Sequence, residues 1–125
     1  MHTREVTPQK RKIRRGDIYY ADLNPTVGSE HGGIRPILVL SNDIGNKYSP
    51  TVIAALISSQ VKKSKKRKLP THIHLPRTCG LTLDSVVMME QIRTLDRLRL
   101  REYIGHLYFS EMPMLQKALS ISLGN

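Results

Sequence analysis

The sequence predicts a mainly β fold of the α+β class, a small antiparallel barrel with a helix packed on its flank. Short apolar runs bounded by Gly, Pro, Asn and Ser recur along the chain, and helical spacing is clear only near the C-terminus. About six short strands with little helix between them favour this architecture. A chain of 125 residues can bury one core without disulfide or metal support.

The organisation expected from residue patterns is one domain preceded by an arm. Residues 1–13 lack apolar periodicity and contain Pro8, so we expect a disordered basic N-terminal arm followed by a single barrel domain over residues 14–125. Regular structure should begin near Asp17, with a first strand at residues 18–21. Pro36 opens the next apolar run, residues 37–40, where proline is tolerated because the first residue of a strand need not donate to a neighbour.

The middle of the chain predicts three further strands. Residues 41–46 are rich in turn formers and should break the preceding run, and residues 51–58 have the β-branched composition of a buried central strand. Alternation over residues 71–75 predicts a strand with one wet face, and residues 85–95 predict another strand. The lysine-rich segment 62–70 between them is expected to be a projecting hairpin tip.

The C-terminal part predicts short elements and one helix. Asp96 can cap a short helical turn, and residues 103–107 resemble a last strand. Ser110 is expected to cap a C-terminal helix in which Met112, Leu115 and Leu119 form one apolar stripe.

The net charge of +10 is concentrated in two segments. Residues 1–15 hold six basic side chains and one Glu, and residues 62–68 hold six basic side chains and no acid. Such runs attract polyanions, nucleic acid first, through counterion release and electrostatic steering. The alternative is that they are solvated tails or a localisation-type signal.

Cysteine content and hydropathy indicate the compartment. The single cysteine, Cys79, excludes an intramolecular disulfide and a cysteine-only metal site, and fits a reducing, cytoplasmic setting. The longest apolar run, residues 52–57, is too short for a signal or a membrane span, so no membrane association is expected.

The segment Gly28–Arg35 predicts a phosphate site. It contains three glycines, which let backbone N–H groups approach an oxyanion, together with Glu30, His31 and a terminal Arg35. The arginine offers a planar fork of donors at the foot of a strand. The alternative is a long turn whose arginine forms a surface ion pair.

The polar trio Ser58-Ser59-Gln60 ends the predicted central strand. If this strand pairs antiparallel with the strand after Pro36, Arg35 and Ser58 share one rim, where a guanidinium and a hydroxyl can hold one phosphate. His72 and His74 share one strand face, but without a third ligand nearby they are better explained as exposed residues than as a metal pair. No motif for a nucleotide cofactor is present, and neither a metal nor a cofactor is expected.

Four segments, residues 15–25, 28–39, 41–46 and 90–94, closely resemble the MazF/PemK family of toxin endoribonucleases, in order and at the expected spacing over residues 14–123. The resemblance implies an SH3-like barrel with flanking short helices that works as a symmetric homodimer. It also implies sequence-specific, metal-independent cleavage of single-stranded RNA. The family's toxins are held inactive by a cognate antitoxin whose flexible acidic segment lies across the RNA groove.

The resemblance also assigns roles to individual residues. Arg35 matches the catalytic arginine, Glu30 matches a loop position implicated in activity, and Ser58 stands where the family usually has a catalytic threonine. This last departure keeps the hydroxyl and loses the methyl that constrains its rotamer. His31 replaces the more usual Gln. The expected RNA contacts are His31, Gly32, Gln60, Lys62, Lys63, Gln91 and Arg93.

The chemistry implied is attack of the RNA 2′-hydroxyl on the adjacent phosphate, which leaves a 2′,3′-cyclic phosphate and a 5′-hydroxyl and spares DNA. Two other functions stay open for the same fold. A related group poisons DNA gyrase by protein contact, and a barrel with basic arms can also be a passive RNA-binding module. Arg35 together with a hydroxyl at Ser58 favours the enzyme, because a gyrase poison needs neither.

Overall fold

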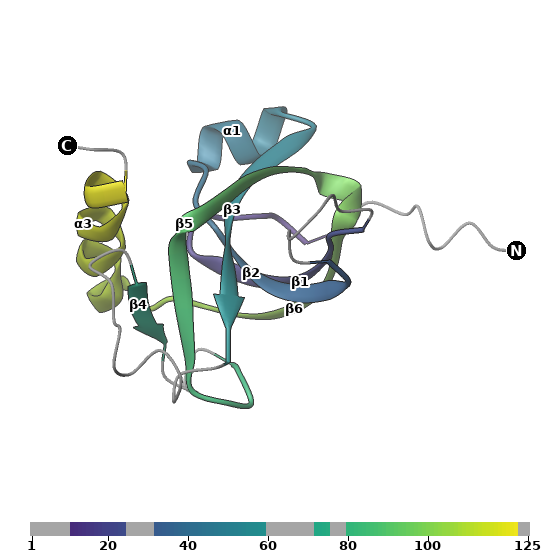
Figure 1. Cartoon of the computed structure of the whole chain (residues 1–125). Helices are drawn as coiled ribbons and strands as arrows, with labels where there is room; N and C mark the ends of the chain where they lie inside the picture. The colour runs from purple at the N-terminus through teal and green to yellow at the C-terminus, as the bar shows by residue number, and fades with distance from the viewer. Residues whose placement is uncertain (1–10, 25–31, 60–71, 76–79, 123–125) are drawn as a thin grey trace, which may run out of the picture.

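Figure 1 presents the computed structural model, which describes residues 11–24, 32–59, 72–75 and 80–122. Strands in this part of the chain form one antiparallel six-stranded sheet in the order β4-β5-β3-β2-β1-β6, and it curls into a half-barrel. The mainly β fold predicted from the sequence is therefore confirmed. The strands are β1 (Asp17–Asp22), β2 (Ile34–Val39), β3 (Thr51–Ser58), β4 (His72–Leu75), β5 (Ser85–Asp96) and β6 (Leu100–His106).

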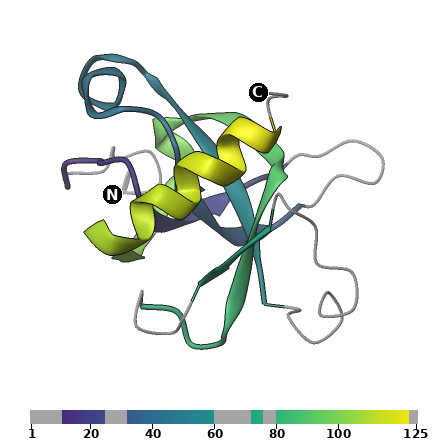
Figure 2. The same ribbon diagram turned by 90° about the vertical axis from the view of Figure 1, so that its left-hand side faces the viewer.

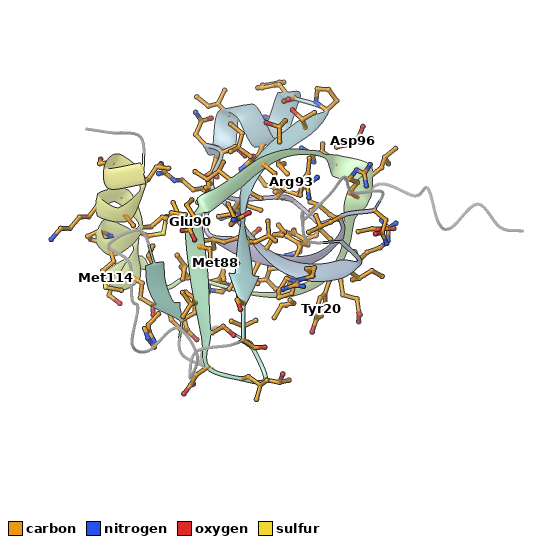
Figure 3. All side chains as sticks on the ribbon, viewed as in Figure 1. Tyr20, Met88, Glu90, Arg93, Asp96 and Met114 are labelled. Carbon is orange, nitrogen blue, oxygen red and sulfur yellow. The ribbon has the colours of Figure 1, made fainter. Side chains whose placement is uncertain are left out.

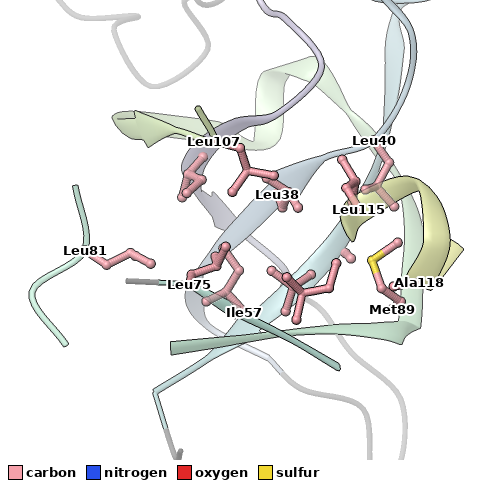
Figure 4. Close-up of a cluster of buried hydrophobic side chains, with 13 residues drawn as sticks. Leu38, Leu40, Ile57, Leu75, Leu81, Met89, Leu107, Leu115 and Ala118 are labelled. Carbon is pink, nitrogen blue, oxygen red and sulfur yellow. The ribbon is translucent and has the colours of Figure 1, made fainter. Parts of the chain in front are cut away.

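The curled sheet buries a different hydrophobic cluster on each of its two faces, because side chains alternate along every strand. Inside the curl lies the inner cluster, which includes Tyr19, Ile37, Leu56 and Leu95. On the outer face, β4 and helix α3 (Met112–Ser122) cover the outer cluster, and Figure 2 shows α3 crossing that face. Its members drawn in Figure 4 include Leu38, Ile57, Leu75, Met89 and Leu115.

Residues 41–46 break the preceding apolar run as predicted, since β2 ends at Val39, but helix α1 (Asp43–Tyr48), which begins within this segment, was not predicted. The Asn42 side chain caps this helix by accepting a hydrogen bond of 2.7 Å from the Gly45 backbone N–H. Asn is favoured both in turns and at helix N-caps, since its side chain binds nearby backbone groups in either place. Composition alone did not separate the two.

The C-terminal elements follow the prediction in part. Asp96 caps the single turn η4 (Arg97–Arg99) through a 2.9 Å bond from the Leu98 N–H, as expected. Ser110, the predicted cap of the last helix, instead lies inside the turn η5 (Phe109–Glu111), and α3 begins after it at Met112. The Glu111 carboxylate accepts from the Tyr108 N–H at 2.9 Å, which stabilises this turn. The predicted apolar stripe is confirmed, with Leu115 fully buried.

Only the end of the predicted N-terminal arm is described, because residues 1–10 lie outside the described residues. Ile13 is 2% exposed and belongs to the inner cluster, so contact with the barrel begins before residue 14. The predicted hairpin tip at residues 62–70 also lies outside the described residues. In the part of the chain that is described, no helix has the length and apolar character needed to cross a membrane.

Candidate functional site

The pairing of β2 with β3 brings the two central candidate residues to neighbouring positions. These strands are antiparallel, with Ile37 opposite Leu56 and Val39 opposite Ala54. The last pair at this end joins Ile37 and Leu56, and Arg35 and Ser58 each lie two residues beyond that pair on their strands. The antiparallel arrangement expected from the sequence is therefore present.

Alternation along the two strands also gives the direction of these side chains. Ile37 and Leu56 both belong to the inner cluster, and Arg35 and Ser58 are each two residues away along their strands, so they face the same side. Both are half-buried, whereas Ile34, which faces the other way, is 61% exposed. By this alternation, Arg35 and Ser58 lie on the inner-cluster side of their strands, and that they share one rim stays a prediction.

The loop that precedes Arg35 is held at its two described ends. The Asn24 side-chain oxygen accepts from the Gly33 N–H at 2.9 Å, and the Gly33 carbonyl accepts from the Leu23 N–H, also at 2.9 Å. Gly33 has a φ of +78°, which residues with a side chain rarely adopt. These two hydrogen bonds fix the chain immediately before Arg35.

Arg99, which lies in the turn after β5, contacts the start of the same loop. Its Nη1 donates to the carbonyl of Asp22 at 2.9 Å and to the carbonyl of Asn24. The Arg101 guanidinium lies 3.5 Å from the Asp22 carboxylate. We did not identify Asn24 or Arg99 from the sequence. Asn24 stands between a strand and a loop, a position typical of a turn-capping side chain, but no sequence pattern connects residues that lie 75 positions apart.

Arg93 and Gln91 lie in an irregular part of β5. Ala55 pairs with Ile92 but the next residue, Leu56, pairs with Met88, so three residues of β5 have no partner in β3. In Figure 3, Met88, Glu90 and Arg93 follow one another up this strand. Arg93 pairs with Ala54 of the inner cluster, which directs it to the same face as Arg35, and it is half-buried.

Arg93 is not immediately beside Ser58. Ala54 lies four residues before Ser58 on β3, which corresponds to about 13 Å along the strand. Gln91 is exposed in the unpaired stretch, and Gly32 is half-buried beside Gly33. Five other predicted site residues lie outside the described residues, namely Glu30, His31, Gln60, Lys62 and Lys63.

The histidine strand is separate from this rim. β4 is the edge strand of the sheet, so β5 and β3 lie between it and β2, and its His74 is exposed. Among the described residues, no group of three or more His, Cys, Asp or Glu side chains gathers closely enough to hold a metal ion.

Comparison with known proteins identifies the family of this chain. Residues 14–123 match the family described as PemK-like, MazF-like toxin of type II toxin-antitoxin system. Endoribonuclease EndoA of Bacillus subtilis is 51% identical over 112 residues, which is 89% of this chain and 94% of that protein.

Solved structures give the same assignment. The crystal structure of MazF from Deinococcus radiodurans has a TM-score of 0.76 and 26% identity, covering 93% of this chain and 100% of that one. A mycobacterial endoribonuclease in complex with its cognate antitoxin has a TM-score of 0.70 and 25% identity, covering 90% of this chain and 94% of that one. The chain therefore belongs to the PemK-like, MazF-like toxins of type II toxin–antitoxin systems, as its motifs predicted, and is an endoribonuclease toxin of the MazF type.

Proposed function

We propose that this protein is a metal-independent, sequence-specific endoribonuclease that cleaves single-stranded RNA through attack of a 2′-hydroxyl on the adjacent phosphate. One observation supports this chemistry above the others. The β2–β3 register carries Arg35 and Ser58 toward one rim on the inner face of the barrel, where both can reach one phosphodiester.

Arg35 stabilises the charge that develops on the phosphorane. A guanidinium stays protonated at neutral pH and presents a planar fork of donors, so it serves as an electrostatic clamp and not as a base. One preorganised donor of this kind contributes about 2.7 to 4 kcal/mol of transition-state stabilisation. The Asn24–Gly33 hydrogen bond and the Arg99 contacts hold the backbone before Arg35, which keeps the clamp in place.

Ser58 donates a hydrogen bond to another oxygen of the same phosphate. The proton of the 2′-hydroxyl passes to Glu30 or His31, and the 5′-oxygen leaves as a hydroxyl after it takes up a proton from water. The products are a 2′,3′-cyclic phosphate and a 5′-hydroxyl. DNA lacks the attacking hydroxyl and is not cleaved.

Family membership supports the remaining parts of the proposal, which concern the RNA contacts and the partners. Gly32, Gln91 and Arg93 contact bases that are splayed from the strand, together with His31 and Gln60, and Lys62 and Lys63 steer the RNA backbone. The mycobacterial relative is an endoribonuclease in complex with its cognate antitoxin. This chain correspondingly works in the cytoplasm as a homodimer, and a cognate antitoxin with a flexible acidic segment inhibits it.

Incubation of the purified protein with single-stranded RNA and with single-stranded DNA, each with and without EDTA, tests the proposal. We expect RNA fragments that end in a cyclic phosphate, at a rate that EDTA does not change, and intact DNA. Loss of activity in EDTA would refute metal independence. Binding of RNA without cleavage would favour the passive RNA-binding module, and neither binding nor cleavage would favour a gyrase poison.

A further inference from the structure

A second basic site lies at the start of β1, away from Arg35. A cavity of about 430 Å³ opens between the segment that precedes β1 and the end of β6. Four cationic side chains line it together with one carboxylate, an imidazole and an apolar residue. These residues are Arg11, Lys12, Arg14, Arg15, Asp17, His106 and Leu107.

The charges in this cavity are not balanced. The Asp17 carboxylate accepts from the Arg14 backbone N–H at 2.9 Å, and its side chain is the one acid among the seven lining residues. The Nε of Arg15 is buried and has no hydrogen-bond partner. That nitrogen is out of reach of solvent, so what a ligand in the cavity meets is the net charge of the lining, with four cationic side chains and one acid. The lining therefore favours a negatively charged ligand.

Two tyrosines contact residues that line this cavity. They are Tyr103 on β6, which contacts Arg11, and Tyr108, which contacts His106. The Arg11 guanidinium lies 3.5 Å from the centroid of the Tyr103 ring, and the Tyr103 hydroxyl is 2.7 Å from His106 Nδ1. The His106 ring in turn meets Tyr108 edge to face, with the centroids 5.5 Å apart. His106 is exposed and Tyr108 is 48% exposed, so both rings are accessible.

The cavity is separate from the rim that holds Arg35 and Ser58. Ala21 of β1 pairs with Arg35, and Asp17 lies four residues earlier on β1, which corresponds to about 13 Å. Arg11 and Lys12 also precede residue 14, where the family match begins. The cavity therefore depends on residues outside the segment that this chain shares with the family.

We propose that this cavity is a second RNA site, which holds a backbone phosphate of the substrate while a neighbouring base stacks on His106 or Tyr108. The inference rests on the proposed function, in which single-stranded RNA is the substrate. Cationic grooves bordered by aromatic rings are typical of single-strand binding, because every base has a face that can stack. An acidic polypeptide would pair with the arginines but would not supply a base that stacks on His106 or Tyr108.

Binding of a mixed-sequence 2′-O-methyl RNA, which no 2′-hydroxyl nuclease can cleave, tests the proposal by fluorescence anisotropy. The variant Arg11→Gln/Lys12→Gln should bind about tenfold more weakly than wild type. The slope of log affinity against log salt should become shallower by about 0.7, the value for one lost phosphate contact on a single strand. The control Lys47→Gln/Lys117→Gln removes the same charge from exposed positions on α1 and α3.

A charge-neutral variant tests stacking separately. Tyr108→Leu should weaken binding about fivefold or more without changing the salt slope, since a stacked base contributes about 1 to 3 kcal/mol. Thermal unfolding of each variant establishes that it is folded.

The outcomes separate this proposal from the proposed function. Equal losses of RNA affinity in Arg11→Gln/Lys12→Gln and in its control would overturn the proposal. If the cavity variant kept its RNA affinity but bound a polyglutamate peptide more weakly than wild type, the cavity would be a protein site and the proposal would also be overturned. Normal cleavage by wild type with unaffected binding by both cavity variants would also overturn it and leave the proposed function standing. RNA binding that depends on the cavity, in a wild-type protein that cleaves no RNA, would support the cavity and overturn the proposed function.

Discussion

A double-mutant cycle on Arg35 and Ser58 tests whether the two side chains act on one phosphate. Replacing Arg35 with Ala should lower single-turnover cleavage about 100- to 1,000-fold, the loss expected for one preorganised donor. Replacing Ser58 with Ala removes one hydrogen bond to a charged oxygen, which costs about 1.5 to 3 kcal/mol or roughly 10- to 150-fold.

The cleavage rate of the Arg35→Ala/Ser58→Ala double variant shows whether the two side chains act on one phosphate. Residues that share one partner couple by about 0.5 to 3 kcal/mol, whereas independent sites add to within about 0.5 kcal/mol. Because Arg35 and Ser58 each lie two residues beyond the Ile37–Leu56 pair and are proposed to hold one phosphate, we expect the double variant to lose less activity than the product of the two single losses. Ser58→Thr restores the family's usual residue and serves as the control that should retain activity.

Cleavage is measured with excess protein on a fluorescently labelled RNA in EDTA, and binding is measured with its 2′-O-methyl analogue. Arg35→Ala should bind this analogue nearly as well as wild type, because the clamp acts mainly in the transition state. Additive losses in the cycle would mean that the two side chains act at different places. Near-normal cleavage by Arg35→Ala would move the active site elsewhere.

Three further substitutions test how the fold supports the site. Asn24→Ala removes the acceptor of the Gly33 N–H and should lower the cleavage rate about 2- to 10-fold with little change in Tm, and an equal fall in Tm and rate would show a purely structural role. Gly80→Ala should unfold roughly 10 °C lower in a thermal scan, because Gly80 has a φ of +103° and an added Cβ would lie 2.3 Å from the Ile104 carbonyl oxygen. An unchanged Tm would contradict that packing. Burial raises the pKa of the Asp17 carboxyl, despite the Arg14 N–H and nearby cations that lower it. The contribution of this carboxyl to the free energy of unfolding is therefore complete below its pKa in the unfolded chain, and it is lost as pH rises through its pKa in the folded protein. Urea unfolding of wild type should therefore lose stability from about pH 4 upward relative to Asp17→Asn, and parallel pH profiles of the two proteins would contradict this sign.

The sequence predicted elements well where composition and burial agree. Residues 51–58 are β-branched and aliphatic, and they form β3 with the predicted bounds because a strand buried on both faces needs apolar residues throughout. Helix α1 was not predicted because Asn42 and Gly45 suit a turn as well as a capped helix. Ile13 was assigned to the arm because a lone apolar residue among basic ones gives no periodicity, yet it is buried in the inner cluster.

The candidate site could be anticipated only where it depends on the pairing of neighbouring strands. The antiparallel pairing of β2 and β3 could be predicted because these strands are consecutive in the chain, and the meeting of Arg35 and Ser58 stays a prediction. The support of the loop needed more, because Arg99 reaches Asp22 only after the sheet order has brought β6 beside β1. The contacts of Arg99 with Asp22 and Asn24 connect the turn after β5 to the start of the loop before Arg35, and a contact between residues 75 positions apart leaves no local signal for Arg99 in the sequence.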